Sequence, residues 1–160
     1  MILVDTGPLV ALFDPKDRQH DRCRRALEEI REPIQTMTPV LTEAFHMLGP
    51  NNLGSTRLRE LVCEGGLSVW CFNRVALVRA FELMELYSDH PMDLADASLV
   101  AAAESIATRK VCTVDRNERG RCRTVRIPPS QPSHSFFSSQ LERPALLDEG
   151  ALAQLGEGLV

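Results

Sequence analysis

Short apolar runs alternate with longer amphipathic stretches along the first 127 residues of the chain. The apolar runs predict strands at 2–5, 34–37, 67–72 and 111–114, with a weaker fifth at 124–127. The stretches between them predict helices at 9–13, 17–31, 40–48, 56–63, 74–87 and 93–107. Strands that alternate with helices pair in parallel, so we expect an α/β protein with a mostly parallel sheet of four or five strands.

The stretch 74–87 has the clearest amphipathic pattern of the predicted helices. Its large apolar residues recur at helical spacing, and we expect them to form the face that packs on the rest of the domain. These residues are Val75, Val78, Phe81, Leu83, Met84, Leu86 and Tyr87.

The sequence changes character after Ile127. Residues 128–135 are polar and rich in proline and serine, and the residues that follow show no sustained periodicity. We therefore predict one domain over residues 1–127 and an atypical C-terminal tail over 128–160, whose composition is compatible with partial disorder.

Composition limits the kind of site the chain can carry. With 44% hydrophobic and 25% charged residues it resembles an ordinary globular protein, and no apolar run reaches the length of a membrane span. The N-terminus lacks the basic stretch of a signal peptide, so a cytoplasmic location is expected.

Five scattered cysteines without a C-x-x-C pair indicate reduced thiols rather than a zinc site. A bound metal would then need oxygen ligands, which points to Mg²⁺ or Mn²⁺.

Several acidic residues fall where the predicted parallel strands end. Asp5 and Asp115 close the first and fourth of the parallel strands, and Glu43 lies in the first turns of the helix after the second. Asp93 and Asp96 lie in the first turn of a later helix, three residues apart and so on one face. All five positions map to the carboxyl edge of the sheet, which is where open α/β sheets bind ligands.

Each acid also has an ordinary explanation when it is taken alone. Asp93 is a natural helix cap, Asp96 suits the positive end of a helix, and Asp5 could form a turn. Glu43 is harder to explain in this way, since its helix is otherwise apolar and a lone carboxylate there is costly. A divalent cation would relieve the repulsion among the acids, and such an ion can activate water against a phosphodiester.

Basic residues cluster next to the last of these acids. Between Arg109 and Arg126 the chain has seven basic and two acidic residues. A basic patch beside an acidic site suits a phosphate-backbone substrate, and Arg116, Arg119 and Arg121 are candidate RNA contacts. A solvated charged surface is the alternative interpretation of the same residues.

Four segments resemble the ordered motifs of PIN-domain proteins. Ile2–Leu9 resembles their opening motif and Thr38–Ala44 their second, which carries an acid on a helix. Pro91–Val100 resembles the third motif and Cys112–Asn117 the fourth. The ordered set covers roughly residues 1–117, and a short chain of this kind is most similar to the VapC-like toxins of type II toxin–antitoxin pairs.

The resemblance implies a fold and an activity. It implies a three-layer α/β/α sandwich and a Mg²⁺- or Mn²⁺-dependent endoribonuclease whose acidic quartet is Asp5, Glu43, Asp96 and Asp115. Asp93 would be an accessory acid, and the hydroxyls of Thr6 and Thr113 would orient carboxylates or water. It also implies an RNA substrate, a cognate antitoxin protein as partner, and a homodimer.

The chain departs from the family pattern after Asp115. Residues 117–123 replace an aromatic segment that is usual there, and the tail 128–160 follows. Divergence and a reading-frame shift in the gene would both account for this. A non-catalytic RNA- or protein-binding module on the same fold is the alternative function, and retention of all four acids favours the enzyme.

Overall fold

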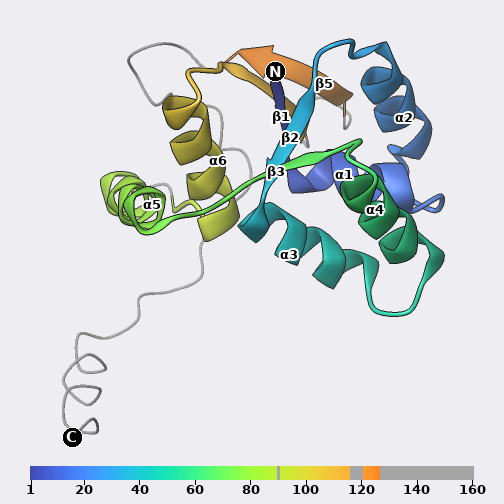
Figure 1. The fold of residues 1–160 in the computed structure, drawn as a ribbon, viewed down its shortest axis with the longest axis horizontal. Coiled ribbons are helices and arrows are strands. Elements are labelled where there is room, and N and C mark those ends of the chain that lie inside the picture. The colour runs from blue at the N-terminus through green and yellow to red at the C-terminus, as the bar shows by residue number, and fades with distance from the viewer. Residues whose placement is uncertain (90, 116–120, 127–160) are drawn as a thin grey trace, which may run out of the picture.

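The computed structural model describes residues 1–89, 91–115 and 121–126. Within these residues five strands and six helices alternate (Figure 1). The strands are β1 (Ile2–Val4), β2 (Ile34–Met37), β3 (Ser68–Trp70), β4 (Lys110–Asp115) and β5 (Arg121–Arg126). The helices are α1 (Thr6–Phe13), α2 (His20–Glu29), α3 (Thr38–Leu48), α4 (Leu53–Cys63), α5 (Arg74–Leu86) and α6 (Leu94–Ser105).

The strands form one sheet in the order β3-β2-β1-β4-β5. The first four are parallel, with Ile2 opposite Ile34 and Val4 opposite Cys112. β5 pairs antiparallel with β4, as expected for a strand that returns directly from its neighbour. The predicted α/β class with a mostly parallel sheet is confirmed, and the fifth strand begins three residues earlier than the sequence suggested.

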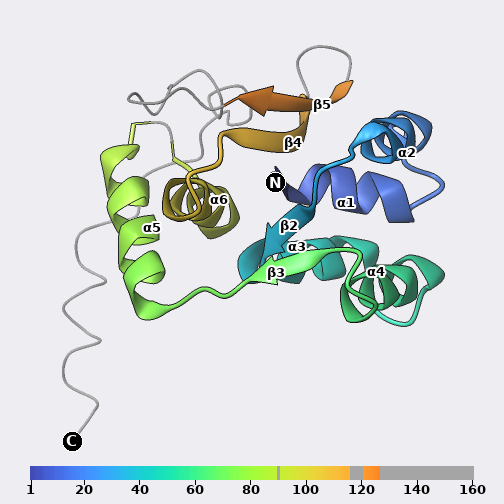
Figure 2. The same ribbon diagram turned by 45° about the horizontal axis from the view of Figure 1, so that its top comes forward.

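Helices cover both faces of this sheet. The chain moves along the sheet in one direction from β1 to β3 and then reverses to reach β4. Because crossovers between parallel strands are right-handed, the reversal separates α1–α4 from α5 and α6. Figure 2 shows the two groups on opposite sides of the sheet. α5 packs on α6 in one group, and α1 packs on α2, α3 and α4 in the other. This is the expected three-layer α/β/α sandwich.

Helix caps explain where two helices begin earlier than predicted. The Asp5 side chain accepts a hydrogen bond from the Thr6 backbone N–H at 2.7 Å, so α1 starts directly after β1. The Asn52 side chain accepts from the Ser55 N–H at 2.8 Å and caps α4 in the same way. Since the first cap follows β1 without a loop, Asp5 is fixed at the carboxyl edge of the sheet.

The prediction for the buried face of α5 is wrong for most of its residues. Val75, Val78, Phe81 and Leu86 are 48–78% exposed. Leu83 and Tyr87 are buried as predicted, and they are joined by Ala76 and Ala80, so the buried positions follow i, i+4, i+7 and i+11. Small side chains at this face let α5 approach α6 closely, and a pattern that counts only large apolar residues misses them.

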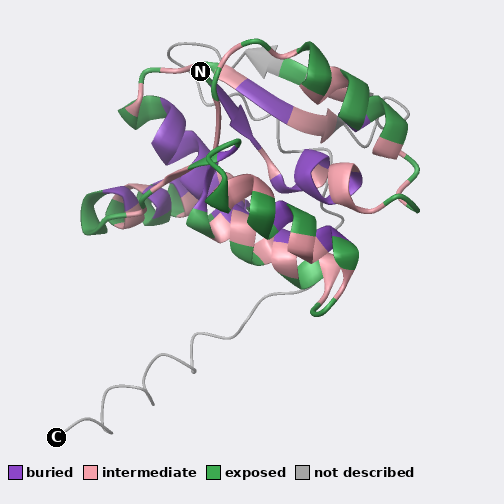
Figure 3. Cartoon of the chain, turned by 45° about the vertical axis from the view of Figure 1, so that its right-hand side comes forward, coloured by how far each residue is buried: buried purple, intermediate pink, exposed green. Residues whose placement is uncertain are grey.

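The core lies between the sheet and its two helical layers. Figure 3 shows buried residues along the strands and over most of α6. In the main cluster Leu3, Val4 and Val111 from the sheet meet Leu9 of α1 and Leu99 of α6. α6 is buried almost all round because it lies between the sheet and α5, so its first turn is held rigidly.

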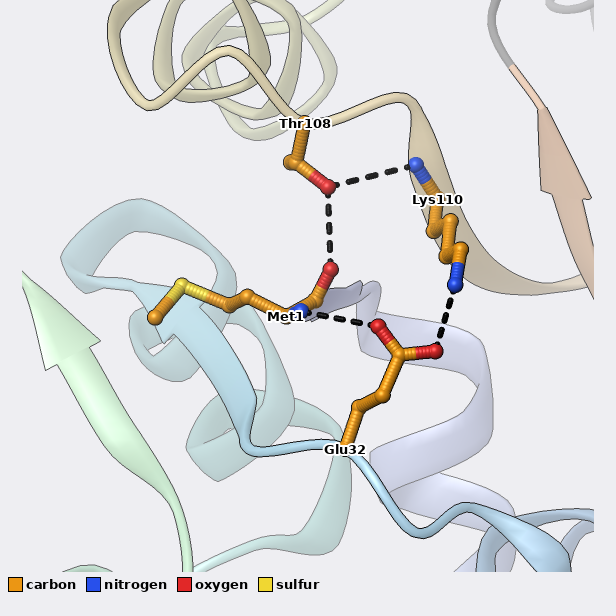
Figure 4. A network of polar contacts seen from close by, with 4 residues as sticks. All are labelled: Met1, Glu32, Thr108 and Lys110. Atoms are coloured by element: carbon orange, nitrogen blue, oxygen red, sulfur yellow. Dashed lines mark hydrogen bonds and ion pairs between the residues drawn. The ribbon is translucent and has the colours of Figure 1, made fainter.

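A polar network fixes the other end of β1 (Figure 4). Glu32 accepts hydrogen bonds from the Met1 α-amino group at 2.9 Å and from the Lys110 ammonium at 2.5 Å. These two donors, Lys110 first, hold the pKa of Glu32 at about 2. Thr108 adds a hydrogen bond to the Met1 carbonyl at 2.9 Å. The network joins the beginning of β1 to β4 and to the segment before β2.

Other expectations concern cysteines, the membrane and the tail. All five cysteines are free thiols, as predicted, and Cys23 and Cys112 are buried. Among the described residues, no helix is both long and apolar enough to cross a membrane. The tail predicted over 128–160 lies outside the described residues, so the domain division stays a prediction.

Gly54 gives a direct test of the packing between α1 and α4. A Cβ at this position would lie 2.5 Å from the Phe13 carbonyl oxygen, which belongs to the last residue of α1. Glycine to alanine in a helix usually stabilises a protein by up to about 1 kcal/mol. At Gly54 we expect Gly54→Ala to destabilise it instead, by about 1–3 kcal/mol, because the two helices must move apart.

Urea denaturation measures this effect, and Arg57→Ala on the exposed side of α4 is the matched control. The control should change the free energy of unfolding by less than about 0.5 kcal/mol. A Gly54→Ala protein as stable as the wild type would show that the helices are not in the described contact.

Candidate active site

Acidic side chains from the end of β1, from α3 and from the start of α6 line one cavity at the carboxyl edge of the sheet. The cavity has a volume of about 170 Å³, and Asp5, Glu43, Asp93 and Asp96 contribute to its wall. Val10, Ala11, Met47 and Val114 give the wall an apolar part. The fold therefore brings together four of the five acids whose convergence the sequence predicts.

Asp5 is held at both carboxylate oxygens. Oδ1 accepts the Thr6 N–H at 2.7 Å, and Oδ2 accepts the Thr113 hydroxyl at 2.8 Å. Thr113 reaches Asp5 because β4 pairs with β1 in parallel, with Cys112 opposite Val4. The side chain of Asp5 thus has a fixed position where β1 ends.

Glu43 reaches the same place from α3. Its Oε2 accepts the hydroxyl of Thr6 at 2.6 Å. Thr6 therefore touches both carboxylates, with its N–H on Asp5 and its hydroxyl on Glu43. Glu43 lies five residues after the start of α3, so it faces the cavity while Val40 and Ala44 face the core.

Asp93 and Asp96 come from the first turn of α6. Asp93 is the N-cap, and its Oδ1 accepts the Asp96 N–H at 2.8 Å. The capping explanation for Asp93 therefore describes a real contact, and the same side chain also lines the cavity. Asp96 lies on the cavity side of a helix that is buried almost all round.

Burial and crowding raise the pKa values of two of these acids. Burial raises the pKa of Asp96 to about 8, and the negative charges of Asp93, Asp5 and Glu43 add to the effect. Burial also raises the pKa of Asp5, against the lowering effect of its bonds to Thr113 and Thr6. Raised carboxyl pKa values at one place mark a site where negative charge lacks compensation, which is typical of functional sites.

A search against family models finds that residues 2–119 match the PIN domain. The chain belongs to the PIN domain family. Among solved structures, the fold is similar to that of VapC20 from Mycobacterium tuberculosis, described as a sarcin-ricin loop cleaving toxin. The TM-score is 0.68 at 18% identity, and the match covers 73% of this chain and 92% of VapC20. A search of curated proteins finds no match.

The oxygen ligands of this PIN domain suit a hard divalent cation. Among the described residues that line the cavity there are carboxylates and hydroxyls and no thiol or imidazole. In the described part of the chain, no three acidic, histidine or cysteine side chains are grouped closely enough to hold an ion alone. Mg²⁺ is commonly bound through one or two carboxylates with water completing its shell, so the donor set of the cavity fits it.

The fourth acid of the predicted quartet is placed only by its backbone. Asp115 is the last residue of β4, opposite Arg121 of β5, at the edge where Asp5 follows β1. The side chains of Asp115 and Arg121 lie outside the described part of the structure, as do the whole of Arg116 and Arg119. The RNA contacts predicted for these arginines stay predictions.

Two polar residues at the cavity of the PIN domain were not predicted. Asp17 and Gln19 line it from the loop between α1 and α2, and the Asp17 carboxylate accepts the Gln19 N–H at 2.6 Å. The residue pattern predicts a helix that begins at Asp17, whereas α2 begins only at His20. The Pro15 turn before it was the available signal for a loop.

Proposed function

We propose that the chain is a Mg²⁺- or Mn²⁺-dependent endoribonuclease. One observation carries the proposal: Asp5, Glu43, Asp93 and Asp96 converge on one small cavity, in a protein of the PIN domain family. Structural carboxylates are dispersed or paired with cations, whereas here the neighbouring negative charges add to the raised pKa values of Asp96 and Asp5. A bound cation would offset the free-energy cost of burying these carboxylates close together.

The residues of the cavity would have different roles in binding the ion and in holding its ligands. Asp5, Glu43 and Asp96, together with Asp115, would hold the ion, directly or through water. When bound, the ion would lower the pKa of a coordinated water and stabilise negative charge on the phosphodiester. Thr6 and Thr113 would orient Glu43 and Asp5, and Asp93 would keep the first turn of α6 in place.

The biological role that we propose is that of the toxin in a toxin–antitoxin pair. The similar structure of VapC20 is that of a sarcin-ricin loop cleaving toxin, which supports both RNA as the substrate class and the toxin role. We further propose a cytoplasmic location, a homodimer, and a cognate antitoxin that blocks the site. A small open reading frame beside the gene would support the antitoxin.

Cleavage of structured RNA with and without a chelator tests the enzymatic proposal. We expect the purified protein to cut RNA in Mg²⁺ or Mn²⁺, to lose this activity in EDTA, and to regain it when the ion is restored in excess. Activity that survives EDTA would contradict the proposal, because it would require a metal-independent or contaminating nuclease.

The same experiment separates the non-catalytic alternative. An RNA- or protein-binding module would bind RNA in both buffers and leave it intact. Intact RNA across several structured and single-stranded substrates, with binding retained, would favour that alternative over the enzyme.

A further inference from the structure

A second concave surface lies between α3 and α4, which are neighbours in the fold (Figure 1). We call it the α3–α4 groove. Its volume is about 500 Å³, within the usual range for ligand sites. Thr42, Phe45 and His46 of α3 line one side, and Asn51, Thr56 and Arg59 line the other.

The groove and the acidic cavity share helix α3. Glu43 and Met47 face the cavity, and their sequence neighbours Thr42 and His46 face the groove. A helix with its side chains is about 10–12 Å across, so only that width separates the two. A chain molecule bound in one could therefore continue into the other.

The chemistry of the groove complements that of the cavity. The cavity wall carries five carboxylates, those of Asp5, Asp17, Glu43, Asp93 and Asp96. The groove lining, which is described throughout, carries none and includes the Arg59 guanidinium. Within the described residues, Arg59 makes no ion pair and the Asn51 amide makes no hydrogen bond. These donors are therefore available to a ligand with negative charge.

The groove is built as a rigid surface. The Asn52 side chain caps α4 at Ser55 and donates to the carbonyl oxygens of Leu48 and Gly49, so one residue ties the end of α3 to the start of α4. The turn between them has Gly49 at φ 78° and Asn51 at φ 57°, the left-handed conformations that a tight reversal needs. A preformed groove loses little entropy when it binds a ligand.

We propose that the α3–α4 groove binds a single-stranded nucleotide of the RNA next to the scissile phosphodiester, with Arg59 on a phosphate and the half-buried Phe45 ring beside a base. This inference rests on the proposed ribonuclease function. Single-stranded RNA is recognised by aromatic rings beside bases and by arginine on the backbone, and the groove offers both. An acidic peptide would use Arg59 but has no need of an aromatic face adjoining a metal cavity.

Binding of RNA without metal tests the groove separately from catalysis. The probe is a short fluorescein-labelled single-stranded RNA, and the full chain is titrated in EDTA at several salt concentrations. Arg59→Gln should raise Kd roughly 10-fold, the effect of one charged hydrogen bond. It should also make the slope of log K against log salt shallower by about 0.7, because one phosphate contact is lost.

Arg57→Gln is the matched control on the same helix. Arg57 is exposed, makes no ion pair within the described residues, and does not line the groove. Its replacement should change Kd by less than about 2-fold. Phe45→Leu keeps an apolar side chain of similar bulk and should raise Kd by roughly 5-fold or more through loss of base contact. During cleavage in Mg²⁺, Arg59→Gln should raise KM and leave kcat unchanged.

Three results would overturn the proposal. The first is an RNA affinity that Arg59→Gln leaves unchanged, and the second is an equal loss of RNA affinity in Arg57→Gln. The third is an Arg59→Gln protein that loses affinity only for a fluorescein-labelled acidic peptide tested in parallel. The last would make the groove a protein-binding site. An Arg59-specific loss of RNA affinity in a protein that never cleaves RNA would support the groove and count against the proposed activity, so the two failures are distinguishable.

Discussion

Replacing Asp96 with asparagine is expected to lower the rate of RNA cleavage more than about 100-fold. Loss of a residue that only orients a metal ligand typically costs 10–100-fold, and loss of a ligand should cost more. Asn keeps the size of the side chain and the backbone N–H that Asp93 caps, so the fold should survive. Asp5→Asn should have an effect of similar size, since Asp5 is the most firmly oriented acid of the cavity.

Single-turnover cleavage rates in saturating Mg²⁺ measure this effect. Glu85→Gln is the matched control, because Glu85 is an exposed acid on α5 and does not line the cavity. It should cleave at the wild-type rate. If Asp96→Asn and Asp5→Asn both stayed within a few-fold of the wild type, the carboxylates of this cavity would not be the reacting centre.

The second large effect of Asp96→Asn is on stability, which we expect the substitution to raise. Without metal, the pKa of Asp96 is about 8 in the folded protein against an ordinary value of 3.8. The folded state then binds the proton more tightly than the unfolded state, so stability falls as pH rises between these values. Asp96→Asn removes this penalty, and in EDTA at pH 8 we expect it to raise Tm by roughly 5 °C or more.

Thermal unfolding at a series of pH values tests this expectation. The difference in Tm between Asp96→Asn and the wild type should shrink as the pH falls toward 4, because Asp96 stays protonated in the folded state and becomes increasingly protonated in the unfolded state. Mg²⁺ should raise the Tm of the wild type more than that of the variant, because a ligand stabilises only the state that binds it. A variant less stable than the wild type at pH 8 in EDTA would mean that the Asp96 carboxylate is compensated within the protein.

The edge where the acids meet could be predicted because the ends of the strands have a strong sequence signal. Asp5 ends an apolar run, and a parallel sheet places such ends together without knowledge of side-chain contacts. The hydroxyl contacts depend on register. Thr113 touches Asp5 only because Cys112, and not a neighbour, lies opposite Val4, and register has no signal in a four-residue apolar run.

Features that depend on packing between helices were not predictable in the same way. The buried face of α5 includes Ala76, and Ala80 packs against α6, but alanine carries little weight in a pattern of large apolar residues. Asp17 and Gln19 enter the cavity from a loop, which has no periodicity to follow. The α3–α4 groove depends on how one turn orients two helices, and the capping contacts of Asn52 that fix it are visible only in the structure.

Binding of Mn²⁺ measured by calorimetry tests the central claim most directly, because it asks whether the acidic cavity holds the ion. The account predicts saturable binding to the wild type and to Glu85→Gln, with release of protons as bound Asp96 ionises. It predicts at least about 10-fold weaker binding to Asp5→Asn and Asp96→Asn. Equal binding to all four proteins, or no binding to the wild type, would contradict it.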